Sequence, residues 1–275
     1  MRSASFNREY ILNELDKLAS KISKPLNLFI IGGLCLIHYG LKEATKDIDV
    51  VLKSSLEFDE LTRSLKEIGY YEPSSIEISR PYKKLAANII LENKDGFRWD
   101  IFLQNVCRAL SFSDEMESRS SLLLKKKFLT VCLASREDIF LFKAVTEREA
   151  DLGDMRVLAE SGLNWEIIKQ ECQKQSLSTG ILWENALYQK LLDLKSKYGI
   201  RSPIEKQLRK IAEEKMAEIA ILEEIKKGNT TVKTISRSLK LSELFIRQSL
   251  EKMEKKGLIK VDKSTRPHKL TLKQK

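Results

Sequence analysis

Residues 46–52 read Lys-Asp-Ile-Asp-Val-Val-Leu, and their alternation of polar and apolar side chains predicts a strand. Asp47 and Asp49 lie two positions apart, so both side chains leave the same face of that strand while Ile48 points into the core. Two carboxylates held this close repel each other unless a cation lies between them. Magnesium is the obvious candidate, because it prefers oxygen ligands and leaves positions for waters and substrate phosphates.

The residues before this strand predict a glycine turn. Residues 26–31 are expected to form a buried strand and residues 34–39 a short helix, with Gly32 and Gly33 between them. Backbone N–H groups at a helix start bind phosphate, and glycine allows a ligand to approach closely. We therefore expect Gly32 and Gly33 to lie at a phosphate site.

A third carboxylate follows the glycine turn and the Asp-Ile-Asp strand. Residues 85–92 and 97–103 flank an Asp-Gly turn and predict a hairpin. Asp100 lies in the middle of the second hairpin strand, where Asp is a poor strand former. If that strand neighbours the strand of Asp47 and Asp49, three carboxylates can hold two metal ions and catalyse nucleotidyl transfer.

The remaining pattern predicts an α/β (α+β) fold, a sheet with a helical rear part. The chain opens with an amphipathic helix after Asn7 that Pro25 stops. Further segments are predicted from the same periodicities: a helix over 56–68, a last strand over 128–133, and helices over 137–147, 151–160, 165–173 and 182–198. The N-terminal domain is thus expected to span residues 1–199, with its helical part from about residue 136.

Taken together, these motifs resemble the signature of the DNA polymerase β-like nucleotidyltransferase superfamily. The matching residues are Ile31-Gly32-Gly33, thirteen intervening residues, Asp47-Ile48-Asp49-Val50, and Asp100 as the third acid. The stretch from Arg136 to Lys143, followed by Arg148, Asp151 and Asp154, resembles the helical region of minimal nucleotidyltransferases and abortive-infection toxins. The resemblance covers about residues 25–160.

The resemblance implies a nucleotidyltransferase-fold mixed sheet and assigns roles to individual residues. Asp47 and Asp49 would bind Mg²⁺ or Mn²⁺, and Asp100 would complete the metal site and help to activate the attacking hydroxyl. Lys143 and Arg148 would contact the triphosphate of a nucleoside triphosphate, for which the charge of Lys143 is suited. For Asp151 and Asp154 a simpler interpretation, ion pairs with Arg148 and Arg156 on a helix, is equally acceptable.

Cysteine and histidine give little scope for other chemistry. The four cysteines form no Cys-x-x-Cys pair, and only two histidines are present, which disfavours a zinc site and a Ser-His-Asp triad. The longest apolar run, residues 28–37, is about half of the ~20 residues that span a membrane. With no apolar signal core after Met1, we expect a cytoplasmic protein without membrane contact.

The charge is distributed unevenly along the chain. Of 49 Lys and Arg and 39 Asp and Glu, 20 basic and 10 acidic residues lie in 201–275, so the whole excess of +10 belongs to the last quarter. Residues 202–227 predict a helix that Ser202 caps, and shorter helices over 232–239 and 242–256 are followed by strands over 258–261 and 269–272. This order is typical of a winged helix-turn-helix domain, which we expect over residues 200–275.

A winged helix contacts nucleic acid through its third helix and its ribbon. The candidate phosphate contacts are Arg237, Arg247, Lys252, Lys263, Arg266 and Lys269. Ser242, Glu243 and Gln248 are candidates to face base edges. Winged helices also serve as protein-docking modules, so a partner protein is the alternative to DNA or tRNA at this domain.

Two hypotheses for function follow. The first is a magnesium-dependent nucleotidyltransferase that moves a nucleoside monophosphate from an NTP to a hydroxyl of tRNA, of another nucleic acid, of a protein or of a small molecule. The second is a DNA-binding transcriptional regulator, or a toxin–antitoxin component, whose nucleotidyltransferase-like domain senses nucleotide without catalysis. Retention of all three acids favours the first.

Overall fold

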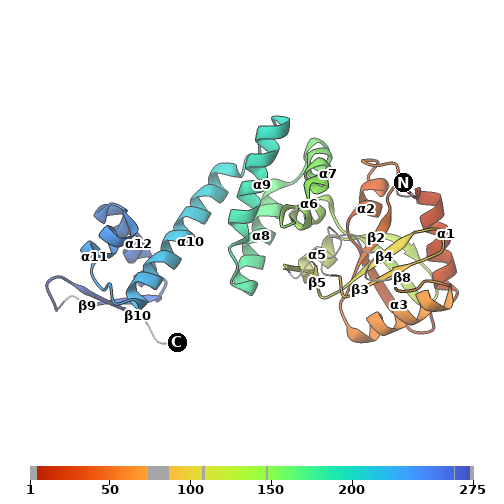
Figure 1. The fold of residues 1–275 in the computed structure, drawn as a ribbon, viewed down its shortest axis with the longest axis horizontal. Helices are drawn as coiled ribbons and strands as arrows, with labels where there is room; N and C mark the ends of the chain where they lie inside the picture. The colour runs from red at the N-terminus through yellow and green to blue at the C-terminus, as the bar shows by residue number, and fades with distance from the viewer. Residues whose placement is uncertain (1–4, 74–86, 107–108, 147, 263, 273–275) are drawn as a thin grey trace. The chain divides into compact units, whose positions relative to one another are not determined.

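The computed structural model describes residues 5–73, 87–106, 109–146, 148–262 and 264–272. The chain divides into two compact units, Met1–Ile204 and Glu205–Lys275, each of which is described by itself (Figure 1). Within the described residues, no helix is both long and apolar enough to cross a membrane.

The first unit is built on a mixed six-stranded sheet. Its strand order is β3-β4-β2-β1-β8-β7. Neighbours β1/β8 and β2/β4 run parallel, whereas β1/β2, β3/β4 and β7/β8 run antiparallel. The sheet strands are β1 (Leu26–Ile30), β2 (Asp47–Leu52), β3 (Ile89–Glu92), β4 (Arg98–Leu103), β7 (Ser121–Lys125) and β8 (Leu129–Leu133). A separate two-stranded ribbon is formed by β5 (Asn105–Val106) and β6 (Leu110–Ser111).

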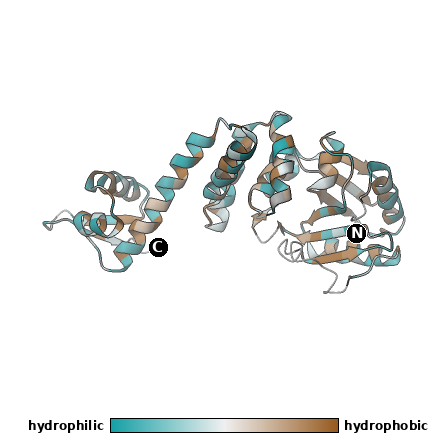
Figure 2. Ribbon diagram, turned by 45° about the horizontal axis from the view of Figure 1, so that its top comes forward, coloured by the Kyte–Doolittle hydropathy of each residue, from teal (hydrophilic) through white to brown (hydrophobic). Residues whose placement is uncertain are grey.

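Helices surround the sheet and continue beyond it as a helical group (Figure 1). The helices beside the sheet are α1 (Arg8–Ala19), α2 (Gly33–His38), α3 (Ser55–Glu67) and α5 (Asp114–Arg119). The later group consists of α6 (Arg136–Ala144), α7 (Glu149–Glu160), α8 (Trp165–Thr179) and α9 (Trp183–Tyr198). Figure 2 shows that the sheet strands carry mostly hydrophobic residues, whereas the helices mix hydrophobic and hydrophilic ones.

The structure confirms the predicted mixed α/β sheet with its helical rear part. Asn7 caps α1 by accepting a hydrogen bond from the backbone N–H of Tyr10, and the predicted hairpin is present as β3 and β4, although residues 85 and 86 lie outside the described part of the chain. Sequence patterning missed β7, because Ser-Leu-Leu-Leu-Lys lacks the alternation of a half-buried strand. It also missed the short strands β5 and β6.

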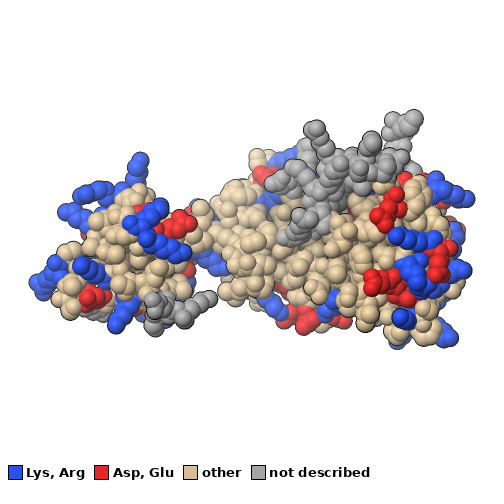
Figure 3. Space-filling view, turned by 60° about the horizontal axis from the view of Figure 1, so that its bottom comes forward, with Lys and Arg blue, Asp and Glu red and all other residues tan. Residues whose placement is uncertain are grey.

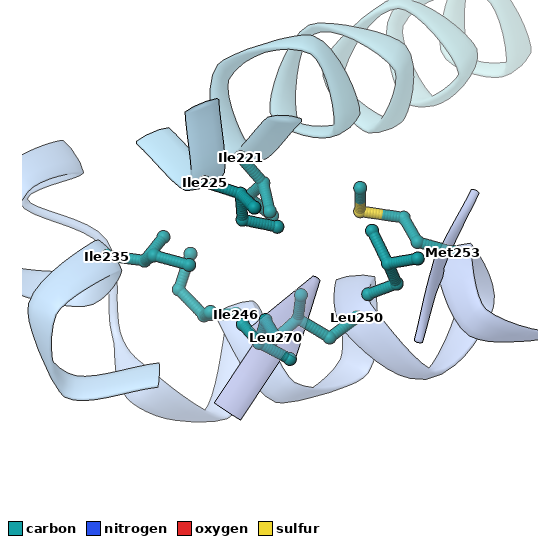
Figure 4. Close-up of a cluster of buried hydrophobic side chains, with 8 residues drawn as sticks. Ile221, Ile225, Ile235, Ile246, Leu250, Met253 and Leu270 are labelled. Atoms are coloured by element: carbon teal, nitrogen blue, oxygen red, sulfur yellow. The ribbon is translucent and has the colours of Figure 1, made fainter. Parts of the chain in front are cut away.

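The second unit has three helices followed by a two-stranded antiparallel ribbon. Its elements are α10 (Glu205–Lys226), α11 (Val232–Leu239), α12 (Glu243–Lys255), β9 (Ile259–Asp262) and β10 (Lys269–Leu272). The predicted helix start at Ser202 was too early, since α10 begins at Glu205. One small core joins these elements: Ile221 and Ile225 from α10, Ile235 from α11, Ile246, Leu250 and Met253 from α12, and Ile259 and Leu270 from the ribbon (Figure 4).

Candidate functional site

The glycine pair brings the start of α2 against the strand that carries the carboxylates. Gly32 precedes α2 with φ of 100°, a conformation that L side chains rarely adopt. A Cβ atom on Gly32 would collide with Asp49 Oδ2, and one on Gly33 would collide with Thr45 Oγ1. A side chain at position 32 would therefore displace the carboxylate of Asp49, and one at position 33 the side chain of Thr45, which explains the two glycines here.

Asp49 and Asp100 lie side by side on neighbouring parallel strands. They are register partners in the pairing of β2 with β4, so both side chains leave the same face of the sheet. Asp49 is half-buried, whereas Asp100 is fully buried at 0% exposure. Among the residues that the structure describes, neither carboxylate oxygen of Asp100 has a hydrogen-bond partner. A buried carboxylate without a partner is costly, which marks this position as one kept for a ligand.

The proximity of the acids raises their pKa values. Burial and the charge of Asp47 raise the pKa of Asp100 to about 7, against the opposing effect of Arg98 and Arg148. The pKa of Asp49 is also well above its usual range, because of burial and the charges of Asp47 and Asp100. A bound cation would relieve both effects.

Asp47 differs from the other two acids because it already has a cationic partner. Arg98 donates to Asp47 Oδ2 at 3.1 Å, and the hydroxyl of Thr45 lies 3.4 Å from Asp47 Oδ1. Over the described ranges, no three Asp, Glu, His or Cys side chains are grouped closely enough to hold a metal ion. The structure thus brings Asp49 and Asp100 together, with Asp47 nearby in an ion pair with Arg98.

The donor chemistry of this pair suits a hard divalent cation. Carboxylate oxygens are the ligands that Mg²⁺ takes, and it needs only one or two of them beside waters and substrate phosphates. The buried oxygens of Asp100 have no other partner, and Asp49 lies beside them. The residues present therefore fit Mg²⁺ or Mn²⁺.

A pocket adjoins Asp49 and extends to α6. It has an empty volume of about 400 Å³, including its open mouth. Its polar lining includes Asp49, Lys143, Thr146, Arg148 and Asp151. Its apolar walls are Ile31, Phe102, Val106, Ile139 and Phe142. An anionic group and an apolar ring of a ligand both find matching surfaces here.

Lys143 enters this pocket as a paired cation. Its Nζ lies 2.9 Å from Asp151 Oδ1 and 2.7 Å from Asp154 Oδ2. Burial would lower the pKa of Lys143, but the two carboxylates outweigh it and the pKa is raised. Lys143 is therefore charged, and the nearby Arg148 Nε is 3.9 Å from Asp151 Oδ2.

The prediction that Asp151 and Asp154 pair with Arg148 and Arg156 was wrong in part. Asp151 does approach Arg148, but both acids pair with Lys143, and Arg156 pairs with Glu160 instead. Sequence reasoning also missed Arg98 as the partner of Asp47. The signal was available, because Arg98 lies two residues before Asp100 and so shares its strand face.

In the second unit, two of the predicted nucleic-acid contacts are held in ion pairs. Lys252 Nζ lies 2.8 Å from Glu214 on α10, and Arg247 lies 3.4 Å from Glu243. Ser242 caps α12, and Gln248 is exposed. Arg237, Arg266 and Lys269 are exposed as well, whereas Lys263 lies outside the described residues.

Comparison with known families identifies the class of protein that this fold and site define. A family model described as nucleotidyltransferase of unknown function (DUF6036) matches residues 10–198, more than two thirds of the chain. The chain therefore belongs to this family of nucleotidyltransferases. Comparison with curated proteins gave no match.

Proposed function

We propose that the first unit transfers a nucleoside monophosphate from an NTP to a hydroxyl acceptor, with Mg²⁺ or Mn²⁺ as cofactor. The observation that carries this proposal is the buried, unpartnered carboxylate of Asp100 beside Asp49 on the neighbouring strand. A structural carboxylate would have a hydrogen-bonding partner at such a position. A catalytic one keeps its oxygens for a cation and for a proton of the substrate.

The proposed reaction uses the acids and the pocket cations together. The acceptor oxygen bonds to the α-phosphorus, the bond from that phosphorus to the bridging oxygen breaks, and pyrophosphate leaves with the electron pair. Asp100 takes the hydroxyl proton, directly or through water. Divalent cations, when bound by Asp47, Asp49 and Asp100, would lower the pKa of the acceptor hydroxyl and neutralise developing charge on the phosphates.

The remaining residues of the pocket bind and orient the nucleotide. Lys143 and Arg148 supply positive charge to the triphosphate, and Gly32 and Gly33 let it approach the backbone. For Lys143 to reach a phosphate, it must exchange Asp151 or Asp154 for the ligand. The ion pairs hold its ammonium group in the pocket until then.

The acceptor is a nucleic acid or a protein, and the second unit recruits it. Three helices followed by a β-ribbon, with a basic excess, are the features of a winged helix that binds nucleic acid. Arg237, Arg266 and Lys269 are exposed and suited to phosphate contact. DNA and tRNA are the first acceptors to test.

Label transfer tests the enzymatic proposal directly. The full chain is incubated with each α-labelled NTP, Mg²⁺ or Mn²⁺, and tRNA, DNA or cell-extract protein as acceptor. We expect label in one acceptor class, a mass increase of one NMP, and loss of transfer in Asp47→Asn and Asp49→Asn. Asp114→Asn is the matched control, because Asp114 is exposed and pairs with Lys53 away from the pocket. Absence of label in every acceptor would contradict the proposal.

A second candidate function is nucleotide sensing without turnover by a DNA-binding regulator. The ion pairs of Asp47 with Arg98 and of Lys143 with Asp151 favour it, since both groups are engaged before any ligand binds. It predicts NTP binding by calorimetry without product, and a DNA gel shift that persists in Asp49→Asn. Detectable NMP transfer would exclude it.

A further inference from the structure

Basic residues in the second unit are concentrated before α12 rather than on it. Residues 226–240 contain five Lys or Arg and no Asp or Glu, whereas α12 contains three of each kind. Figure 3 shows many Lys and Arg side chains over this unit, at the left of the view. The helix with the strongest attraction for an anion is therefore α11 and not α12.

The cations of α11 and of its C-cap form a stripe, which we define as Lys233, Arg237 and Lys240. Lys233 and Arg237, four residues apart, lie on one face of α11, opposite the buried Ile235, and Lys240 follows directly after the last helical residue in a left-handed conformation. All three are exposed, and in the described part of the chain none has an ion pair or a hydrogen bond from its side chain. At 1.5 Å per residue, Lys233 and Arg237 are about 6 Å apart along the helix axis. This spacing is close to that of successive phosphates on one strand.

Two of the three cations of α12, Arg247 and Lys252, are paired with acids of their own chain, as is Lys256 at its C-cap, whereas Lys255 is exposed. Arg247 pairs with Glu243, Lys252 pairs with Glu214, and Lys256 pairs with Glu218. Leu244, near the start of the same helix, is 67% exposed. A phosphate backbone at α12 would have to break these ion pairs and would meet apolar and acidic side chains.

We propose that a nucleic-acid phosphate backbone docks along α11 through the stripe of Lys233, Arg237 and Lys240. This inference rests on the part of the proposed function that assigns nucleic-acid recruitment to the second unit. The occupant is a nucleic acid rather than a neutral or basic protein surface, because three neighbouring cations without any acid between them complement a row of phosphates. Contacts of this kind fix position without reading bases, so affinity is expected to be largely independent of sequence.

Fluorescence anisotropy with the full chain tests this surface. The probes are a labelled DNA duplex and labelled tRNA, titrated at salt concentrations from about 50 to 200 mM. The first variant combines Lys233→Gln, Arg237→Gln and Lys240→Gln. The rival-surface variant combines Arg247→Gln, Lys252→Gln and Lys255→Gln, which removes the same charge from α12. Glutamine keeps helix propensity, and thermal melts check that both variants fold.

The expected result is a loss confined to the α11 variant. Three lost phosphate contacts reduce the slope of log K against log salt by about 2 to 3, and weaken binding more than about tenfold at low salt. The α12 variant should change the slope by less than about 1. A larger loss in the α12 variant than in the α11 variant would overturn the inference and leave nucleic-acid recruitment intact.

Two further outcomes separate this inference from the proposed function. If the wild-type chain binds neither probe, both the α11 inference and nucleic-acid recruitment fail, while NMP transfer to a protein is tested independently. If binding is lost in the α11 variant but no acceptor is ever labelled, the docking surface stands and the enzymatic proposal fails. NTP binding should be the same in both triple variants, because the nucleotide pocket belongs to the first unit.

Discussion

Glu60 on α3 and Asp100 on β4 are both buried carboxylates of the first unit, but their surroundings are opposite. Glu60 Oε1 accepts hydrogen bonds from the backbone N–H groups of Ser23 and Lys24, at 2.7 and 3.2 Å, and from Arg63 at 2.8 Å. Asp100 accepts none from the described part of the chain. Burial would raise both pKa values, yet hydrogen bonds lower that of Glu60 to about 2, whereas that of Asp100 is raised to about 7.

The difference separates an acid whose charge fixed donors stabilise from an acid that we propose is kept for chemistry. Glu60 joins α3 to the chain between α1 and β1, and its charge is stabilised by fixed donors. Asp100 destabilises the folded state whenever it is ionised without a cation.

The largest effect is expected from Asp100→Asn. Loss of the proton acceptor and metal ligand should lower NMP transfer by about 10²–10⁴-fold, the usual contribution of a positioned base. Stability should not fall, because the Asp100 carboxylate makes no hydrogen bond that asparagine would lose. Label transfer and urea denaturation at pH 8 measure the two quantities. A normal transfer rate with lowered stability would show that Asp100 is structural.

The same variant should remove a pH dependence of stability. The pKa of Asp100 is about 7 in the folded protein against about 3.9 unfolded, so the folded state binds more protons between these values. Stability of the metal-free wild type should therefore fall as pH rises from about 4 to about 7, by up to about 4 kcal/mol, and level off above pH 7. The profile of Asp100→Asn should be flatter in this window.

Arg119→Met should remove the cation that two buried acids share and leave them with the hydrogen bonds from Ser135 and Gln175. Arg119 lies 2.7 Å from Asp138 Oδ1 and 2.8 Å from Glu171 Oε2, and both acids are buried. Removing the shared cation should cost about 3–5 kcal/mol, the usual result of breaking a buried pair. Urea denaturation measures this cost. Arg156→Met is the matched control, since the one acid that Arg156 pairs with among the described residues is the exposed Glu160, at 3.9 Å. Equal losses in both variants would contradict the expectation.

Asp49, Asp100 and Asp138 show how much could be predicted from the sequence. The alternation of residues 46–52 and the hairpin pattern correctly placed Asp49 and Asp100 on strands, and Asp100 was singled out because Asp is a poor strand former. The roles of both acids in a site stay predictions. The partners of Asp138 could not be predicted, because Arg119 and Glu171 come from α5 and α8 and meet only in the folded chain. Local periodicity carries no information about such contacts.

The same limit applies to the pocket and to the edge of the sheet. Lys143 was predicted from its place in a motif, but its pairing with Asp154 required the packing of α6 on α7. The strand β7 was missed because its pairing with β8, and not its own pattern, makes it a strand. Features encoded in neighbouring residues were predictable, whereas features created by tertiary pairing were not.

The smallest effect is expected from Glu60→Gln, which keeps the shape of the side chain but removes the charge that its donors stabilise. The variant should lose about 1–3 kcal/mol of stability at pH 7, since hydrogen bonds to a charged acceptor are weakened. The pKa of Glu60 is about 2 when folded and about 4.5 when unfolded, so this contribution is fully present above pH 4.5 and is lost as pH falls through 2.

The stability difference between wild type and Glu60→Gln should therefore shrink in acid, the reverse of the trend for Asp100. Glu67→Gln is the matched control, because Glu67 lies on the same helix and pairs with the same Arg63 but is exposed. An exposed pair contributes less than about 1 kcal/mol, so this control should change little at any pH. Equal effects of the two substitutions would show that Arg63, rather than the backbone donors of Ser23 and Lys24, stabilises Glu60. The contrast with Asp100 would then rest on one ion pair instead of on a complete set of hydrogen bonds.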